Sequence, residues 1–332
     1  MSASVLDLKN LSVRFATPEG EVAAVSELSL SVGKGECLGI VGESGSGKSQ
    51  TFLAAMGLLA RNGRAVGEAI FGGINLAAAD ENTLNRLRGN KLAMIFQDPM
   101  TSLTPHMKVG HQLTEVLVRH RNLKFPAARD RAIAMLRRVQ ISEPERRFEM
   151  YPHELSGGLR QRVMIAMALM CGPELIIADE PTTALDVTVQ AQILDLIRRA
   201  KEELGTAVIL ITHDLGVVAG MADRVGVMYA GRIVELGEVH QIFNAPQHPY
   251  TKGLLACTPR LDDATASALV TIPGQPPDLQ QLPTGCAYHP RCGNVMERCR
   301  AAAPPLMSTG GGGLKACFLE NFGSVQAGTV VP

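Results

Sequence analysis

One segment of the chain constrains its fold more than any other: Gly42-Glu43-Ser44-Gly45-Ser46-Gly47-Lys48-Ser49. It follows a short apolar run, Cys37–Val41, and precedes a helical pattern from Ser49 to Leu59. The spacing G-x-x-x-x-G-K-[ST] between a strand and a helix is typical of loops that bind phosphate. Its glycines let backbone N–H groups turn toward phosphate oxygens, and the helix N-terminus adds partial positive charge. We therefore expect a P-loop α/β core, which is RecA-like.

Two residues at the end of this loop are candidate ligands of a bound nucleotide. The ammonium group of Lys48 would reach the β- and γ-phosphates, and the hydroxyl of Ser49 would bind Mg²⁺. The alternative is a glycine-rich turn that matches the pattern by chance. The strand before the loop and the helix after it favour ATP and Mg²⁺ as cofactors.

An acidic pair follows a second apolar run. The run Leu175–Ala178 leads directly into Asp179 and Glu180. Carboxylates that follow the buried strands of such sheets face the nucleotide crevice. Asp179 would hold Mg²⁺, largely through water, and Glu180 would orient or deprotonate the attacking water, because phosphoryl transfer depends on positioning and charge neutralisation. The alternative is a solvated strand end.

The order of apolar patterns predicts an α/β fold with a helical lobe inserted into it. Residues 5–15 alternate between apolar and polar, and residues 22–30 give a second strand, so we expect antiparallel strands near the N-terminus. From about 101 to 172 the periodicity is helical, and strand patterns return at 207–212 and 224–229. Strands that alternate with helices imply a mostly parallel sheet covered on both faces.

The chain changes character after about residue 250. Eight prolines between Pro259 and Pro305, and four glycines from Gly310 to Gly313, predict an extension with little regular structure. We therefore expect a nucleotide-binding domain at 1–250, with its helical lobe at about 101–172, and a Pro/Gly/Cys-rich extension at 251–332.

Charge and hydropathy exclude several classes of protein. Lys and Arg number 32 and so do Asp and Glu, and there is no Trp, so we expect no nucleic acid as a partner. No apolar run reaches the roughly 18–20 residues that cross a bilayer. The first fifteen residues carry Asp7, Lys9 and Arg14, unlike a secretory signal. We expect a cytosolic chain that can dock on a membrane protein.

Four of the seven cysteines lie close to the C-terminus: Cys286, Cys292, Cys299 and Cys317. A reducing cytosol disfavours disulfides between them. Their spacing is wider than that of most zinc modules and differs from that of ferredoxins. A bound metal would order a segment that lacks its own core, with His289 as a weak substitute ligand. Four unliganded thiols are the alternative.

A further motif separates classes of P-loop protein. The run Leu155-Ser156-Gly157-Gly158-Leu159-Arg160-Gln161 resembles the LSGGQ signature of ABC ATPases, with Leu159 in the place of the usual Gln. Ser156 and the amides of Gly157 and Gly158 would cap a helix that continues to Met170. In ABC proteins this helix end contacts the γ-phosphate held by the opposite subunit. The resemblance therefore implies that two chains share each nucleotide site; taken alone, the run would be a plain N-capped helix.

Other positions match this family in order along the chain. Gln97 resembles the glutamine that senses Mg²⁺ and faces the membrane subunit, and Thr183-Ala184-Leu185-Asp186 resembles the D-loop. His213 resembles the switch histidine near the γ-phosphate, although a single His at a strand end is more often structural. Phe15 lies where the family places an aromatic ring on adenine, with a core Phe as the alternative.

The resemblance covers about residues 5–325 and becomes narrower in three segments. These segments, Gln97–Leu103, His248–Tyr250 and Pro290–Cys292, are similar to the oligopeptide/dipeptide importer ATPases. Within that group, Met56–Leu59 with Asn62–Arg64, and Ile272–Gly274, are most similar to the D-type subunits. This family implies a paralogous ATPase partner in a heterodimer, two transmembrane permeases and an extracytoplasmic peptide-binding protein. It implies a location at the cytoplasmic face of the cell membrane. It also implies an iron–sulfur cluster, [4Fe–4S], on the four C-terminal cysteines, with zinc as the second choice.

We therefore expect an ATP-hydrolysing subunit that drives peptide import. One alternative is import of another solute, such as nickel, glutathione or a sugar-like molecule. A second is an ABC ATPase of DNA repair or of the ribosome, but the span from Ser49 to Ser156 is too short for a long coiled coil and only one phosphate loop is present. A third is a redox- or iron-sensing role for the cysteine tail.

Overall fold

The structure is a computed structural model that describes residues 4–183, 185–257, 271–309 and 311–320. These residues form two compact units, each assembled from separate stretches of the chain. The described residues of the first unit come from 1–6, 32–37 and 78–211, and those of the second unit from 7–31, 38–77 and 212–332.

The first unit contains three parallel strands: β6 (Leu92–Ile95), β7 (Leu175–Asp179) and β8 (Ala207–Ile211). β7 is the middle strand, with Leu175 opposite both Leu92 and Ala207. Every residue of β7 and of β8 is buried, as expected for parallel strands covered on both faces. The apolar runs in the sequence predicted both strands to within one residue.

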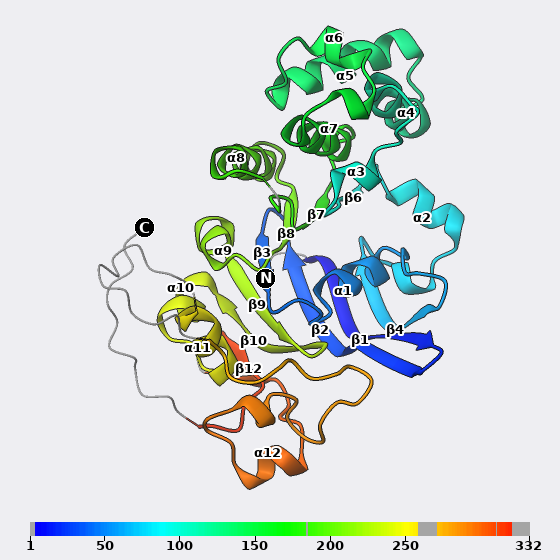
Figure 1. Ribbon diagram of the computed structural model, residues 1–332. Helices are drawn as coiled ribbons and strands as arrows, with labels where there is room; N and C mark the ends of the chain where they lie inside the picture. Colours follow the sequence, from blue (N-terminus) through cyan, green and yellow to red (C-terminus); the bar gives the residue numbers. More distant parts are fainter. Residues whose placement is uncertain (1–3, 184, 258–270, 310, 321–332) are drawn as a thin grey trace, which may run out of the picture. The chain divides into compact units, whose positions relative to one another are not determined.

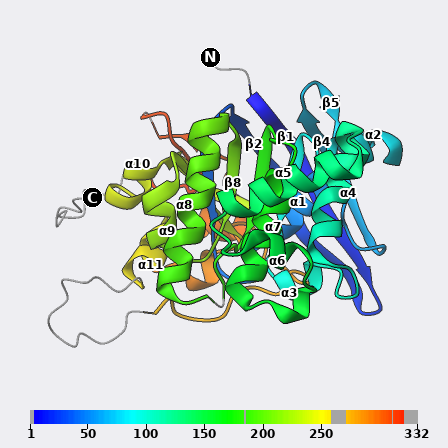
Figure 2. The ribbon, with the colours of Figure 1, turned by 90° about the horizontal axis from the view of Figure 1, so that it is seen from above.

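Helices make up most of the rest of the first unit: α2 (Glu81–Leu87), α3 (Pro99–Ser102), α4 (Val109–Arg121), α5 (Phe125–Arg138), α6 (Pro144–Phe148), α7 (Gly157–Leu169) and α8 (Val187–Leu204). Figures 1 and 2 show α4, α5, α6 and α7 gathered into one group. This group is the helical lobe predicted at about 101–172. Pro152–Glu154 adds a short 3-10 turn before α7.

The residues at the ends of two helices in this lobe explain where α4 stops and where α5 starts. α4 ends at Asn122, which has a left-handed backbone (φ 51°), and α5 carries a proline in its first turn. Along α5, Ala128, Ala132 and Leu136 follow one another at intervals of four residues, and all are fully buried. The buried stripe of α5 therefore packs into the core of the lobe.

The second unit contains two groups of strands. The first has the order β2-β1-β4-β5, formed by β1 (Ser4–Thr17), β2 (Gly20–Gly33), β4 (Gly63–Phe71) and β5 (Ile74–Asn75). Residues 4–6 of β1 and 32–33 of β2 are counted with the first unit. The second has the order β3-β9-β10-β12-β11, formed by β3 (Cys37–Val41), β9 (Arg224–Tyr229), β10 (Arg232–Glu238), β12 (Leu314–Lys315) and β11 (Met307–Ser308). β3 is parallel to β9, whereas β9 and β10 form an antiparallel hairpin.

The remaining helices of the second unit are short: α1 (Lys48–Ala55), α9 (Leu215–Met221), α10 (Val239–Asn244), α11 (Pro249–Ala256) and α12 (Glu297–Ala301). α1 is shorter than the predicted helix at 49–59. The chain leaves the helix at Gly57, which has a left-handed backbone (φ 65°) that favours glycine over any residue with a side chain.

The C-terminal extension is mostly irregular but not detached from the sheet. β12 pairs with the outer side of β10, with Glu235 opposite Lys315 and Leu236 opposite Leu314. The sequence did not indicate this strand, because two residues after a run of glycines carry no periodic signal. Of the predicted extension at 251–332, residues 258–270, 310 and 321–332 lie outside the described residues. Among the described residues, we find no helix with the length and apolar character needed to cross a membrane.

Replacing Leu136 with Ala tests whether the helical lobe has a tightly packed core of its own. Leu136 is fully buried, so the truncation should lower the free energy of unfolding by about 2–5 kcal/mol. Urea denaturation measures this difference. The matched control is Leu204→Ala, because Leu204 is 42% exposed at the end of α8. Equal losses at the two positions would contradict the packing described here.

Candidate functional site

The phosphate loop of the second unit has a backbone that only glycine tolerates at its two ends. A Cβ atom on Gly42 would lie 2.2 Å from the carbonyl oxygen of Met228, and one on Gly47 would lie 2.3 Å from that of Ala24. Both glycines have positive φ angles, 153° and 95°. Neighbouring backbone therefore holds the loop closely between β3 and α1.

The side chain of Lys48 folds back across this loop. Its Nζ donates to the carbonyl oxygen of Gly42 at 2.8 Å and to that of Glu43 at 3.0 Å. The hydroxyl of Ser46 is buried and has no hydrogen-bond partner among the described residues. A buried hydroxyl and a lysine ammonium beside a glycine-rich turn form a donor set that fits phosphate oxygens. Ser44 and Gly45 are exposed at the tip of the loop, and Ser49 is half-buried at the start of α1.

Two other predicted residues lie in the second unit. Phe15 is half-buried on β1, and its ring packs so closely on Gly63 that a Cβ there would lie 2.5 Å from it. Gly63 therefore lies directly against the ring, which is still partly exposed. His213 is exposed and lies two residues after the end of β8. The next residue, Asp214, caps α9 by accepting hydrogen bonds from Gly216 N and Val217 N.

The acidic pair belongs to the first unit. Asp179 ends β7 and is buried, whereas Glu180 is half-buried and has a left-handed backbone, with φ of 45°. Its N–H still donates to the carbonyl oxygen of Ile211, so the ladder between β7 and β8 extends one residue beyond β7. A non-glycine residue in this conformation is strained, and such strain clusters at functional sites.

Two donors fix the carboxylate of Glu180. Oε2 accepts from Nε2 of Gln97 at 2.9 Å and from Oγ1 of Thr183 at 2.9 Å. Gln97 is exposed, two residues after the end of β6. The structure therefore brings together two predicted catalytic residues that are 83 positions apart. Ala184, in the predicted D-loop, lies outside the described residues, but Asp186 in the same motif caps α8 by accepting from Val189 N at 2.9 Å.

The signature segment forms the N-terminus of α7, as predicted. The Ser156 hydroxyl accepts from Leu159 N at 3.4 Å, and Gly157 and Gly158 begin the helix. A Cβ on Gly157 would meet nothing within 4 Å, so this helix end is open. One contact next to Glu180 could not be predicted from the sequence. Gln161 is 2% exposed and donates to the carbonyl oxygen of Pro181 at 2.7 Å, next to Glu180.

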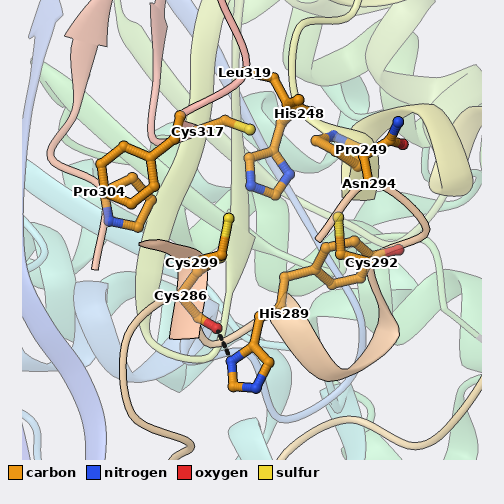
Figure 3. A pocket seen from close by; sticks show the side chains of 12 residues that line it. His248, Pro249, Cys286, His289, Cys292, Asn294, Cys299, Pro304, Cys317 and Leu319 are labelled. Carbon is orange, nitrogen blue, oxygen red and sulfur yellow. Dashed lines mark hydrogen bonds between the residues drawn. The ribbon is translucent and has the colours of Figure 1, made fainter. Parts of the chain in front are cut away.

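The four C-terminal cysteines line one cavity in the second unit, together with His248 and His289 (Figure 3). The cavity is small, about 10 Å³, the space of one water-sized sphere. Burial raises the pKa of Cys286 to about 11, and burial also raises the pKa of Cys292 and Cys317. The Cys286 thiol is therefore protonated at neutral pH, and a metal would have to displace its proton.

The two histidines of this cavity have other hydrogen-bond partners. His248 Nδ1 accepts from Tyr250 N at 3.1 Å, and its ring also hydrogen-bonds the backbone of Ala316. Burial lowers the pKa of His248 to about 3, so its ring is neutral. Nδ1 of His289 lies 3.0 Å from the Cys286 carbonyl oxygen, as Figure 3 shows. The sequence pattern did not indicate that His248 lies beside the cysteines, because it is 38 positions before Cys286.

Thiols elsewhere in the chain do not join the cavity. Cys37 and Cys171 are buried, whereas Cys257 is half-buried at the end of α11. Among the described residues, no three His, Cys, Asp or Glu side chains are grouped so that they could hold one metal ion.

Comparison with known proteins identifies the family. The profile of the family described as ABC transporter matches residues 25–183. The oligopeptide transport ATP-binding protein OppD of Escherichia coli K12 is 56% identical over 95% of this chain and 93% of its own length. The chain belongs to the ABC transporter family of ATP-binding proteins. OppD of Bacillus subtilis 168 is 51% identical, over 91% of this chain and 85% of its own length.

Solved structures support the same fold for this ABC protein. A dimeric ATP-binding cassette in a post-hydrolysis state, bound to ADP and Pi, matches with a TM-score of 0.64 and 29% identity. The match covers 70% of this chain and 98% of that one. The predicted P-loop core with its helical lobe is thereby confirmed. A second profile, the C-terminal region of oligopeptide/dipeptide transporters, matches residues 234–299 and includes three of the four clustered cysteines.

Replacing Gln161 with Ala tests the contact that sequence reasoning missed. The truncation leaves the Pro181 carbonyl oxygen without this buried donor, so the free energy of unfolding should fall by about 1–3 kcal/mol. Urea denaturation measures the change. Gln281→Ala is the control, because Gln281 is exposed and should shift stability by less than about 0.5 kcal/mol. If both variants were equally stable, the contact would contribute nothing.

Proposed function

We propose that this chain is the ATP-hydrolysing subunit of an ABC importer for oligopeptides. The observation that carries the proposal is the 56% identity to a protein named for oligopeptide transport, over nearly the full length of both chains. The match to the C-terminal region of oligopeptide/dipeptide transporters favours peptides over nickel, glutathione or sugars. It also argues against an ABC ATPase of DNA repair or of the ribosome.

The phosphate loop, Gly42–Ser49, would bind the phosphates of ATP, with Lys48 on the β- and γ-phosphates. The buried Ser46 hydroxyl and the two glycines held against backbone carbonyls support this role. Ser49, Gln97 and Asp179 are the proposed ligands of Mg²⁺, which supplies neutralising charge on the phosphate oxygens. Phe15 would stack on adenine, and His213 would sense the γ-phosphate.

Glu180 is the proposed catalytic base. A carboxylate that orients the attacking water must hold one position, and the bonds from Gln97 and Thr183 support such a position. Because Gln97 also belongs to the proposed Mg²⁺ ligands, its amide would report nucleotide occupancy to Glu180. Loss of this contact would slow hydrolysis more than it weakens nucleotide binding.

We further propose that two ATPase chains, this one and a paralogue, form a heterodimer in which each completes the other's site. Ser156, Gly157 and Gly158 would contact the γ-phosphate held by the partner, since an open helix N-terminus attracts anions. The open space around Gly157 supports this assignment. Closure around two nucleotides would then shift the attached permeases between two states, because ATP binds the closed state more tightly.

The proposed location is the cytoplasmic face of the cell membrane, where the chain would bind two permease subunits served by an extracytoplasmic peptide-binding protein. Phe96 is 39% exposed and Met100 is 60% exposed, on either side of Gln97. Exposed apolar side chains are suited to bind a permease. Because they flank Gln97, a movement of the permease would shift Gln97 and, through it, the carboxylate of Glu180.

The cysteine cavity is proposed to hold a [4Fe–4S] cluster. Zinc needs its ligands within about 2.3 Å of a single point, whereas in a four-iron cluster each thiolate binds its own iron. Four thiols that line one cavity are the observation that supports the cluster, with zinc as the alternative. Because the cavity is about 10 Å³, either group would have to spread the thiols apart.

Replacing Glu180 with Gln tests the catalytic assignment. Gln cannot accept the proton of water, so ATP turnover should fall at least about a hundredfold while ATP binding persists. Phosphate release by the chain together with its partner ATPase measures turnover, and retained radiolabelled ATP measures binding. Glu202→Gln serves as the control, because Glu202 is exposed on α8. Turnover at the wild-type rate in the Glu180 variant would refute its role as base.

Metal analysis of the anaerobically purified full chain tests the cluster. We expect about four iron atoms and four acid-labile sulfides per chain, and loss of both in Cys292→Ser. Cys257→Ser should retain them, because Cys257 does not line the cavity. One zinc without sulfide would indicate the alternative metal, and no metal in protein from iron-replete cells would refute a metal site.

A further inference from the structure

An ion pair joins the C-terminal extension to the phosphate loop within the second unit. Arg291 and Glu43 are 248 positions apart, yet two parallel hydrogen bonds connect them: Nη1 to Oε2 at 2.7 Å and Nη2 to Oε1 at 3.0 Å. Their side chains are only 5% and 25% exposed. Charge-assisted pairs of this geometry are stronger than single bonds and fix the relative orientation of both groups.

The extension holds Arg291 firmly on its own side. Nε donates to the carbonyl oxygen of Pro273 at 2.8 Å, and Nη2 also approaches that of Ile272 at 3.4 Å. The guanidinium lies over the ring of Tyr229, 5.9 Å from its centroid. The hydrogen bonds to the Glu43 carboxylate raise the pKa of Arg291 above its ordinary value. Arg291 is therefore an anchored, permanently charged group facing the loop.

A second contact reaches the same loop residue. The hydroxyl of Tyr250, a fully buried residue of α11, accepts from Glu43 N at 2.9 Å. The ring of Tyr250 packs against Tyr229 and Tyr288, with centroids 4.6 Å and 5.4 Å away. Backbone and side chain of Glu43 are thus both held by residues outside the loop.

The position of Glu43 determines that of Lys48. The carbonyl oxygen of Glu43 accepts from Lys48 Nζ, and that of the preceding Gly42 does the same. A carboxylate on the second residue of a phosphate loop would also repel an incoming phosphate, unless a cation neutralises it. Arg291 supplies that cation, at a site where partial burial reduces screening by solvent.

We propose that Arg291 is a positioning residue for ATP, which neutralises Glu43 and holds the phosphate loop in its binding conformation. This inference rests on the proposed binding of ATP at Gly42–Ser49. It assigns the C-terminal extension a role in nucleotide affinity, exerted through one side chain. The short turn His289–Arg291 ends at Arg291, and the next residue, Cys292, lines the thiol cavity. The residue that contacts the phosphate loop is therefore adjacent in the chain to a residue of the thiol cavity.

Binding of MgATP to the full chain, measured by calorimetry, tests the proposal through a charge cycle. Arg291→Gln should weaken affinity about tenfold, because Glu43 is left unpaired beside the phosphates. Arg291→Lys should recover part of this loss, since it restores charge without the paired geometry. In the double variant Glu43→Gln/Arg291→Gln, affinity should exceed that of Arg291→Gln alone. Arg300→Gln, at an exposed position of α12, should bind as the wild type does.

The outcomes separate this inference from the proposed function. If the wild-type chain binds no MgATP, the proposed function fails. If the wild type binds but Arg291→Gln binds equally well, the positioning role is refuted. If the double variant binds more weakly than Arg291→Gln, Arg291 serves packing alone and the electrostatic role is refuted. Thermal unfolding of each variant shows which of them retain the fold.

Discussion

Close backbone approach around the phosphate loop is the constraint on which the rest of the nucleotide site depends. Gly42 faces the Met228 carbonyl oxygen and Gly47 faces that of Ala24, at distances that exclude any side chain. Because β9 and β2 supply these carbonyls, the loop is shaped by strands that come before and after it in the chain. The position of Lys48 follows from this shape, since its ammonium group is held by loop carbonyls.

The proposed phosphate-binding residues and the proposed catalytic carboxylate are held in position in different ways. In the second unit, glycine backbone and an external ion pair shape the phosphate loop. In the first unit, a strained backbone at Glu180 and two side-chain donors aim a carboxylate. Preorganised groups of this kind suit phosphoryl transfer, in which little covalent work falls to the protein. The residues proposed to bind the phosphates thus belong to the second unit, and the proposed catalytic carboxylate belongs to the first.

Elements with a strong local signal could be predicted from the sequence, and long-range side-chain contacts could not. Short apolar runs predicted β7 and β8, and the phosphate loop was evident from its spacing alone. The Arg291–Glu43 pair was not predictable, because 32 basic and 32 acidic residues offer no local rule for pairing. The bond from Gln97 to Glu180 joins two recognised motifs, but nothing in either motif specifies contact between them. Clustering in the sequence did indicate the shared thiol cavity, whereas His248 enters it from another segment.

The central claim is that ATP hydrolysis requires two ATPase chains, each completing the other's site. The direct measurement is specific ATPase activity per chain across a dilution series, with the chain alone and mixed with its paralogous partner. Because dimers dissociate on dilution, the account predicts that activity per chain falls toward zero and is restored by the partner. A monomer that hydrolyses ATP at an undiminished rate at the lowest concentration, with or without a partner, would contradict it.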